Sequence, residues 1–309
     1  IFDLVKKIDL RAANKKAFEN LVLAGGFDSF TGVYRSQYFN PDGDGITFLE
    51  KALRFGAKYQ ENLNSAQTSL FSDATNETYQ DLTIPPCESW STLVRLKKEK
   101  EVVGIYISSH PLSDFKHEME HFINLPLNRL ADLQPYINRE LNVGGIVNDV
   151  QHLESRNGKG WARFMVEDFT DQYEFRIFGE EYLKYRHFLV VNQFIRIRLM
   201  IREGWANRET GKVGAARMQY LQFEMLQNTI ENNAKKLTLQ MDIHQMEEEP
   251  LEALYQTLRG FKGQKPLLFN VYDTDKKIKL TLNSKKQKIA ITQELLNVLD
   301  EQQWHYKLN

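Results

Sequence analysis

Between residues 141 and 227 the sequence alternates apolar and polar residues in short runs, and this period of two limits the possible fold more than any other feature. Three runs, "NVGGIVNDVQHL", "GWARFMVED" and "QYEFRIFG", precede a helix-like "EEYLKYRHFL"; two more, "QFIRIRLMI" and "VGAARMQYLQFEML", follow it. Such alternation is typical of strands with one buried face. Three strands, a helix and two strands is the order of an OB-fold β-barrel, which we predict for residues 141–228.

The alternation also sorts these residues into a core face and an outer face. The predicted core residues are Phe164, Val166, Phe175, Ile177, Ile195, Ile197 and Leu199. The predicted outer residues, with two from the loop "SRNGKGW", are Arg156, Lys159, Trp161, Arg163, Arg176, Phe178, Arg196 and Arg198. Arginines and aromatic rings suit a single strand of nucleic acid, through phosphate contacts and base stacking. Residues 141–218 hold twelve basic and ten acidic residues, so a purely structural barrel stays open beside this preferred interpretation.

The regions on either side of this barrel have different patterns. Residues 1–60 read as helices, residues 61–90 as a polar linker, and residues 91–140 as a helical connector that contains the string "GIYISSHPL". Residues 229–309 alternate strands and helices in the order β-α-β-β-α-β, which predicts a small split-βαβ domain suited to docking. The predicted fold class is therefore multidomain α+β.

A glycine pair in the first region is a weak candidate for phosphate contact. The helix predicted in "NKKAFENLVLAGGFDSF" breaks at Gly25 and Gly26, as in a helix-hairpin-helix-like element, and Lys15 and Lys16 lie near its start. Backbone N–H groups at such a turn can bind a phosphate. Two glycines after a helix are also a common helix C-cap, and the sequence leaves both interpretations open.

Composition narrows the class of protein. A length of 309 residues leaves room for several domains, and a formal net charge of -1 excludes a globally basic nucleic-acid coat. The single cysteine, Cys87, cannot form an internal disulfide, and no apolar run approaches the ~20 residues that span a bilayer. We expect a cytoplasmic protein without membrane partners. Because the chain begins at Ile1 in an amphipathic pattern, we also expect it to be a piece of a longer protein.

Two short motifs suggest metal sites, and we favour neither. "HEMEH", from His117 to His121, fits the zinc-peptidase string, but its surroundings are charged and no third ligand is indicated. "NPDGDGITFLEK" resembles a calcium-binding loop, but Lys51 stands where the bidentate glutamate is required, so a plain turn is the better interpretation. We therefore predict no metal ligands, no catalytic residues and no cofactor in this chain.

The polar stretch "SAQTSLFSDATN" contains two adjacent apolar residues, Leu70 and Phe71, three positions after Gln67. Neither helical nor strand periodicity gives these side chains a core in this chain. A short extended peptide of this kind can enter an apolar groove on a partner, with the glutamine amide fixing its register. The alternative is that both side chains fold back onto the helical region.

Three features together resemble one family. "FDLVKKIDLRAANKKAFENLVLAGGFDSF", the "GIYISSHPL" string and the predicted barrel are similar to the C-terminal third of the bacterial replicative DNA polymerase III alpha subunit. The resemblance implies that Gln67, Leu70 and Phe71 bind the sliding clamp, that the barrel binds single-stranded template, and that residues 229–309 dock the tau protein of the clamp loader. It also implies that the polymerase chemistry and its Mg²⁺ belong to domains outside this chain. A free-standing OB-fold protein that binds single-stranded nucleic acid is the alternative, and a zinc hydrolase is a distant third.

Overall fold

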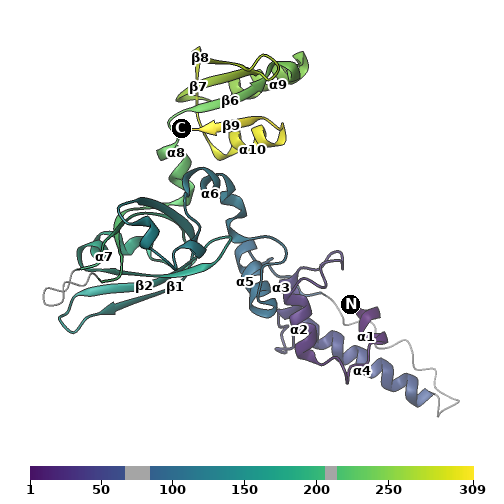
Figure 1. Cartoon of the computed structure of the whole chain (residues 1–309). Coiled ribbons are helices and arrows are strands. Elements are labelled where there is room, and N and C mark those ends of the chain that lie inside the picture. The colour runs from purple at the N-terminus through teal and green to yellow at the C-terminus, as the bar shows by residue number, and fades with distance from the viewer. Residues whose placement is uncertain (67–83, 206–213) are drawn as a thin grey trace. The chain divides into compact units, whose positions relative to one another are not determined.

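The computed structural model describes residues 1–66, 84–205 and 214–309 (Figure 1). The chain divides into two compact units. The first unit spans Ile1–Pro111 and the second Leu112–Asn309. The first unit is helical, and the second holds two sheets. The predicted mixed α+β class is confirmed at this level.

The helices of the first unit pack around an aromatic core. They are α1 (Phe2–Lys7), α2 (Lys15–Leu23), α3 (Arg35–Phe39), α4 (Phe48–Ala66) and α5 (Thr92–Val103). The buried residues of this core are Val5, Phe18, Val22, Phe27, Tyr38, Phe48, Leu49 and Phe55. Helix α4 continues six residues into the segment predicted as linker, and the carbonyl of Pro85 accepts a hydrogen bond from Gln37 Nε2 at 2.9 Å. Part of that segment is therefore packed on this unit.

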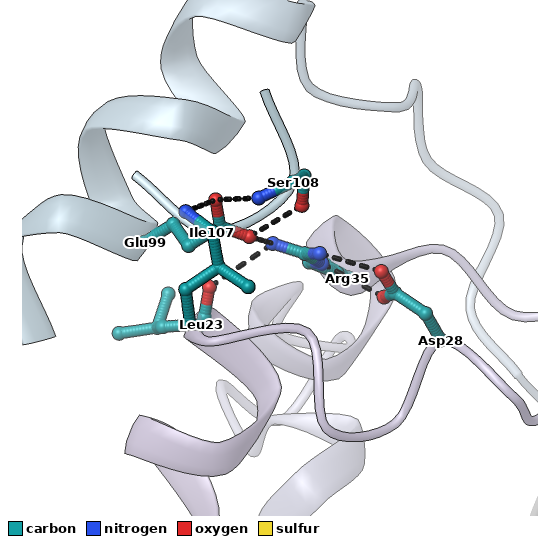
Figure 2. A network of polar contacts seen from close by, with 6 residues as sticks. All are labelled: Leu23, Asp28, Arg35, Glu99, Ile107 and Ser108. Carbon is teal, nitrogen blue, oxygen red and sulfur yellow. Dashed lines mark hydrogen bonds and ion pairs between the residues drawn. The ribbon is translucent and has the colours of Figure 1, made fainter. Parts of the chain in front are cut away.

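A buried ion pair ties the turn after α2 to helix α5 (Figure 2). Arg35 of α3 donates through Nε to Asp28 at 2.7 Å, and through Nη1 to the carbonyl of Leu23 at 3.1 Å and to Glu99 Oε1 at 3.2 Å. Glu99 is fully buried and accepts the backbone N–H groups of Ile107 and Ser108. Burial works to raise the pKa of Glu99, but hydrogen bonds from Ser108, Ile107 and Arg35 outweigh it and hold the pKa below its usual value.

The first sheet of the second unit has five strands in the order β3-β2-β1-β4-β5. They are β1 (Glu140–Glu154), β2 (Gly160–Glu167), β3 (Gln172–Phe178), β4 (Phe194–Arg202) and β5 (Arg217–Met225), with α7 (Gly179–Tyr185) between β3 and β4. The start of β1 pairs with β4 and its end with β2, across a bulge between Val147 and Asp149. The order of elements is the predicted one, and all seven predicted core residues are buried.

The strand pairing leaves this sheet open, whereas the sequence predicted a barrel. Strands β3 and β5 are its edges in the described pairing. A side chain links these two edges, since the Tyr220 hydroxyl of β5 donates to the carbonyl of Arg176 of β3 at 3.0 Å. The Tyr220 N–H donates to Glu181 of α7 at 3.1 Å. Alternation predicts strands and faces, but closure depends on the register of the edge strands, which alternation does not encode.

The second sheet has four strands in the order β8-β7-β6-β9. Its elements are β6 (Leu237–Asp242), α9 (Glu248–Gly260), β7 (Lys262–Asp273), β8 (Ile278–Ile289), α10 (Gln293–Glu301) and β9 (His305–Leu308). The order β-α-β-β-α-β is as predicted, but the split arrangement is wrong, because β6 and β7 pair directly and in parallel. A helical crossover can join either neighbouring or separated parallel strands, so the element order alone does not decide between them.

Two short helices complete the second unit. They are α6 (Lys116–Phe122) and α8 (Thr229–Asn233). His117 of α6 is buried; its Nε2 lies 2.8 Å from Asn297 Oδ1 and its Nδ1 lies 3.1 Å from the Tyr306 hydroxyl. Phe122 belongs to the core of the second sheet. Helix α6 is thus held against α10 and β9.

Candidate nucleic-acid interface

The register of β1, β2 and β3 places two rows of side chains on their outer face. Leu153 pairs with Trp161, and Trp161 pairs with Phe178. One step along, Arg163 pairs with Gln151 on one side and with Arg176 on the other. Directly paired residues point to the same side of a sheet. The face therefore carries an apolar and aromatic row beside a row of two arginines and an amide.

The aromatic row offers flat ring surface. Trp161 and Phe178 stack with ring centroids 5.2 Å apart and an interplanar angle of 17°. Phe178 is 55% exposed, Trp161 is half-buried, and Leu153 is exposed. Two stacked rings at a surface form a platform on which a base can stack further.

Each arginine of the second row is held by a partner on the same face. Arg163 donates to Gln151 at 2.9 Å, and Arg176 donates to Glu174 at 2.8 and 2.9 Å. Arg163 Nη1 also lies 3.8 Å from Glu174, so one carboxylate is close to both cations. These contacts align the guanidinium groups but lower the net charge that the face presents.

Arg156 and Lys159 lie in the turn that joins β1 to β2, and both are exposed. Ser155 closes this turn, since its Oγ and its N–H bond the backbone of Lys159. After β4, Trp205 is 77% exposed, and the Arg217 guanidinium lies 4.3 Å from the centre of its ring. The neighbouring Arg208 and Lys212 lie outside the described residues.

Arg196 and Arg198 of β4 are placed differently, and the prediction that Arg196 is exposed on the outer face is wrong. Arg196 is only 9% exposed and bonds Glu224 at 3.0 Å and Asn142 at 2.7 Å. Glu224 in turn accepts from Asn232 and Asn233 of α8. A second layer therefore covers this part of the sheet. Arg198 is partly exposed and lies 2.7 Å from Glu140.

The glycine pair serves the end of α2. Gly25, with φ of 88°, donates its N–H to Val22, and Gly26 donates to Leu21, which is the hydrogen-bond pattern of a Schellman C-cap. Lys15 pairs with Glu50 and Glu19, and Lys16 pairs with Glu19. Because both N–H groups and both lysines have partners within the chain, we include no phosphate contact in the proposal below.

The two metal-like motifs have structural explanations. The Asp42 carboxylate accepts the N–H groups of Asp44 and Ile46 and pairs with Lys51, which makes a plain turn. In "HEMEH", both ring nitrogens of His117 lie against Asn297 and Tyr306, and His121 lies against the Tyr306 ring. Glu118 is buried, and burial raises the pKa of its carboxyl.

The one group of described His, Cys, Asp and Glu side chains close enough to share a metal ion is His244, Asp273 and Asp275. His244 Nε2 lies 3.2 Å from Asp273 and 3.4 Å from Asp275, so contacts among the three side chains account for the cluster. The predicted clamp-binding residues Gln67, Leu70 and Phe71 lie outside the described residues. No helix among the residues that the structure describes is long and apolar enough to cross a membrane.

Sequence reasoning missed Leu153 and Gln151 as members of the outer face. Both lie on β1, where they extend the aromatic row and the arginine row by one strand. The alternation of β1 places them outside, but only the register shows which residues of β2 they accompany.

An open antiparallel sheet followed by a β-α-β-β-α-β domain defines the chain as a multidomain α+β protein. Residues 237–309 match the family described as the C-terminal domain of the DNA polymerase III alpha subunit. DNA polymerase III subunit alpha of Mycobacterium tuberculosis is 32% identical over 187 residues, which cover 59% of this chain and 15% of that protein. Its counterparts in Vibrio cholerae and Escherichia coli O157:H7 are each 23% identical, over 83% and 85% of this chain and 22% of those proteins.

These matches confirm that the chain resembles the C-terminal region of the DNA polymerase III alpha subunit. The chain spans between 15% and 22% of the length of these three relatives. Among solved structures, RecG bound to a three-way DNA junction aligns with 82% of this chain and 36% of that one, at 12% identity and a TM-score of 0.21, a similarity too low to argue from.

Proposed function

We propose that this chain is the non-catalytic C-terminal part of a replicative DNA polymerase III alpha subunit and that its five-stranded sheet is an open OB-fold that binds single-stranded template DNA. The observation that carries the DNA-binding proposal is the pair of adjacent rows on β1, β2 and β3, rings in one and arginines in the next. OB-folds bind oligonucleotides on the face of strands 2 and 3 and with the loops that join strands 1–2 and 4–5. Trp161, Arg163, Arg176 and Phe178 lie on that face, and Arg156 and Lys159 lie in the first of those loops.

The rows match the chemistry of a single strand. Bases stack on the Trp161–Phe178 platform, while Arg163 and Arg176 contact the phosphates that run beside them. Neither stacking nor phosphate contact reads the hydrogen-bonding edges of the bases, so we expect binding to be independent of the DNA sequence. Because Glu174 offsets part of the positive charge, we expect binding to be weak and strongly reduced by salt.

Binding of a fluorescent oligothymidine to the whole chain, followed by anisotropy over a range of salt concentrations, tests this proposal. The double variant Arg163→Ala/Arg176→Ala should bind more weakly and should lower the slope of log K against log salt by about 1.4, since each lost phosphate contact on a single strand contributes about 0.7.

The matched control is Arg186→Ala/Arg259→Ala, which removes two exposed arginines elsewhere in the second unit. This control should keep the wild-type slope. Equal slopes for the wild type and the face variant would refute the DNA-binding proposal.

The clamp contact is a second part of the proposal. Gln67, Leu70 and Phe71 match the pattern of the family's clamp-binding peptide, and a Leu-Phe pair supplies apolar area while the glutamine amide supplies directional hydrogen bonds. Leu70→Ala/Phe71→Ala should abolish most binding to the cognate sliding clamp, and Gln67→Ala should weaken it less. A peptide spanning Ser65 to Asp73 should compete.

The clamp test separates two explanations of the Leu-Phe pair. If both side chains were packed in a core of this chain, the double variant would lose several kcal/mol of stability, because a buried Phe→Ala alone costs about 3 to 5 kcal/mol. We expect an unchanged melting temperature together with lost clamp binding. Normal clamp binding by the double variant would remove the clamp from the proposal.

The remaining partners follow from the family resemblance. We propose that residues 229–309 dock the tau protein of the clamp loader and that the parent protein acts in the cytoplasm. In this proposal the nucleotidyl transfer and its Mg²⁺ belong to other domains of the parent protein. The alternative, a free-standing OB-fold protein, predicts an open reading frame that codes for no polymerase domains before residue 1.

A further inference from the structure

The apolar face of the second sheet extends beyond the helices that cover it. Leu239, Phe269 and Leu282 lie side by side on β6, β7 and β8, as do Met241, Val271 and Leu280 one step along. Helices α9 and α10 bury the β6 residues of these rows. The residues that continue these rows on β8 are exposed. The exposed fractions are 59% for Ile278, 54% for Leu280 and 46% for Leu282.

The same strand is an edge of the sheet. In the order β8-β7-β6-β9, β8 pairs on one side with β7, and the described pairing gives it no strand on the other side. From Ile278 to Asn283 the pairing with β7 is regular, so this part of β8 presents a row of backbone N–H and C=O groups beside the exposed apolar row. An edge of this length is a template on which another strand can pair.

The positive charge of the residues in and beside β8 determines which kind of partner strand can pair with this edge. Residues 276–288 contain six lysines and no aspartate or glutamate. All six lysines are exposed. Lys279 alternates with the apolar row and so points to the opposite side of the strand, and Lys277 lies in the turn just before β8, with φ of 53°. Lysines on an edge oppose pairing with a second copy of the same edge, because like charges would meet. The complement is a strand that carries acidic side chains.

We propose that β8 binds an extended segment of a partner protein in which acidic residues alternate with apolar ones, added as a fifth strand of this sheet. The apolar side chains of the segment would lie beside Leu280 and Leu282, and its carboxylates would pair with Lys277 and Lys279. Single-stranded DNA fits this edge less well, since residues 276–288 contain no aromatic ring on which a base could stack. The inference is independent of the DNA face and of whether the partner is the tau protein.

The probe is a fluorescein-labelled peptide of four Glu-Val repeats, capped at both ends, titrated into the whole chain and followed by anisotropy. The charge variant Lys277→Glu/Lys279→Glu should bind it at least about ten-fold more weakly, because attraction becomes repulsion. The variant Leu280→Thr keeps every lysine and the β propensity of the strand. Its affinity for the peptide should fall by at least about three-fold, because apolar contact area is lost.

The matched control is Lys307→Glu on β9, which is the opposite edge of the same sheet. This control should bind the peptide as the wild type does, and peptide binding should slow amide hydrogen exchange along β8. Equal loss in the control and the charge variant would overturn the proposal, as would unchanged exchange on β8 or no binding by the wild type. Oligothymidine binding that depends on Lys277 and Lys279 would assign the edge to nucleic acid instead. Unchanged far-ultraviolet circular dichroism and melting temperatures verify that each variant folds.

Discussion

The outer side of the five-stranded sheet has two parts whose sequences look alike and whose structures differ. "GWARFMVE" and "QYEFRIF" form β2 and β3, and "FIRIRLMIR" forms β4; each alternates apolar residues with residues that include arginine. On β2 and β3, Arg163 and Arg176 remain at the surface beside the stacked rings of Trp161 and Phe178. On β4, Arg196 is buried between Glu224 and Asn142.

The difference comes from what lies above each part. Helix α8 follows β5 after one short turn, and its Asn232 and Asn233 bond Glu224, so the chain that comes next covers the part of β4 and β5 around Arg196. Alternation tells which residues leave the core, but it does not tell whether they reach solvent or a second layer. An arginine that meets a second layer needs a buried carboxylate, and Glu224 provides it.

The largest effect we expect is on stability, from Arg196→Ala. This change leaves the Glu224 carboxylate buried without its cation, and breaking a buried pair in this way costs about 3 to 5 kcal/mol. Urea denaturation should show this loss in the free energy of unfolding. Arg176→Ala, the control on the exposed part, should stay within about 0.5 kcal/mol of the wild type. Equal stability of the two variants would erase the distinction between the two parts of the sheet.

Arg35 in the helical first unit is also buried against a carboxylate, so a change there shows whether a buried arginine contributes stability outside a sheet as well. Glu99→Gln removes the charge that faces Arg35 and weakens the bonds to Ile107 and Ser108, at a cost of about 1 to 3 kcal/mol. The folded pKa of Glu99 is depressed, so its charge stabilises the fold above the unfolded pKa and this contribution is lost as pH falls through the folded value.

Thermal melts from pH 7 to pH 3 measure this contribution. The wild type should lose stability over the acid end of this range, and Glu99→Gln should lose less, since its side chain does not titrate. Parallel curves of melting temperature against pH for the two proteins would show that ionisation of Glu99 does not contribute to the pH dependence of stability.

A third change tests the aromatic row of the exposed part. Trp161→Ala removes half of the stacked platform and should cost about 1 to 3 kcal/mol of single-strand binding, the usual value of one base stacked on a ring. The salt slope should stay as in the wild type, because no phosphate contact is lost. Tyr255→Ala on α9 is the control, an exposed ring far along the chain from this face. Equal affinities for these two variants would exclude base stacking on Trp161.

Sequence reasoning reached the strands and the core because one-sided burial imposes a period of two. All seven core residues, from Phe164 to Leu199, were assigned correctly from that period. It missed what depends on contacts between distant segments: the open edges at β3 and β5, the direct pairing of β6 with β7, and the cover over Arg196. The glycine pair needs only local contacts: Gly25 and Gly26 bond the carbonyls of their own helix, which is the C-cap that the sequence left open as one of two interpretations.

The smallest effect we expect comes from Glu174→Gln, and its sign is opposite to that of the other changes. Glu174 lies 2.8 Å from Arg176 and 3.8 Å from Arg163, so its carboxylate competes with DNA phosphates for both cations. Exposed ion pairs are worth about 0 to 1 kcal/mol, which limits the gain in DNA affinity to about five-fold. Gln keeps the size and the hydrogen bonds of Glu, so stability should not change.

The gain should shrink as salt rises, because screening weakens the repulsion between Glu174 and the phosphates. Anisotropy titrations with oligothymidine at low and moderate salt measure it. Glu180→Gln, an exposed carboxylate in the first turn of α7, is the control for a general change of charge. An equal gain in both variants would mean that overall charge, rather than the pairing of Glu174 with Arg163 and Arg176, sets the affinity of this face. A gain confined to Glu174→Gln would place the phosphates beside these two arginines.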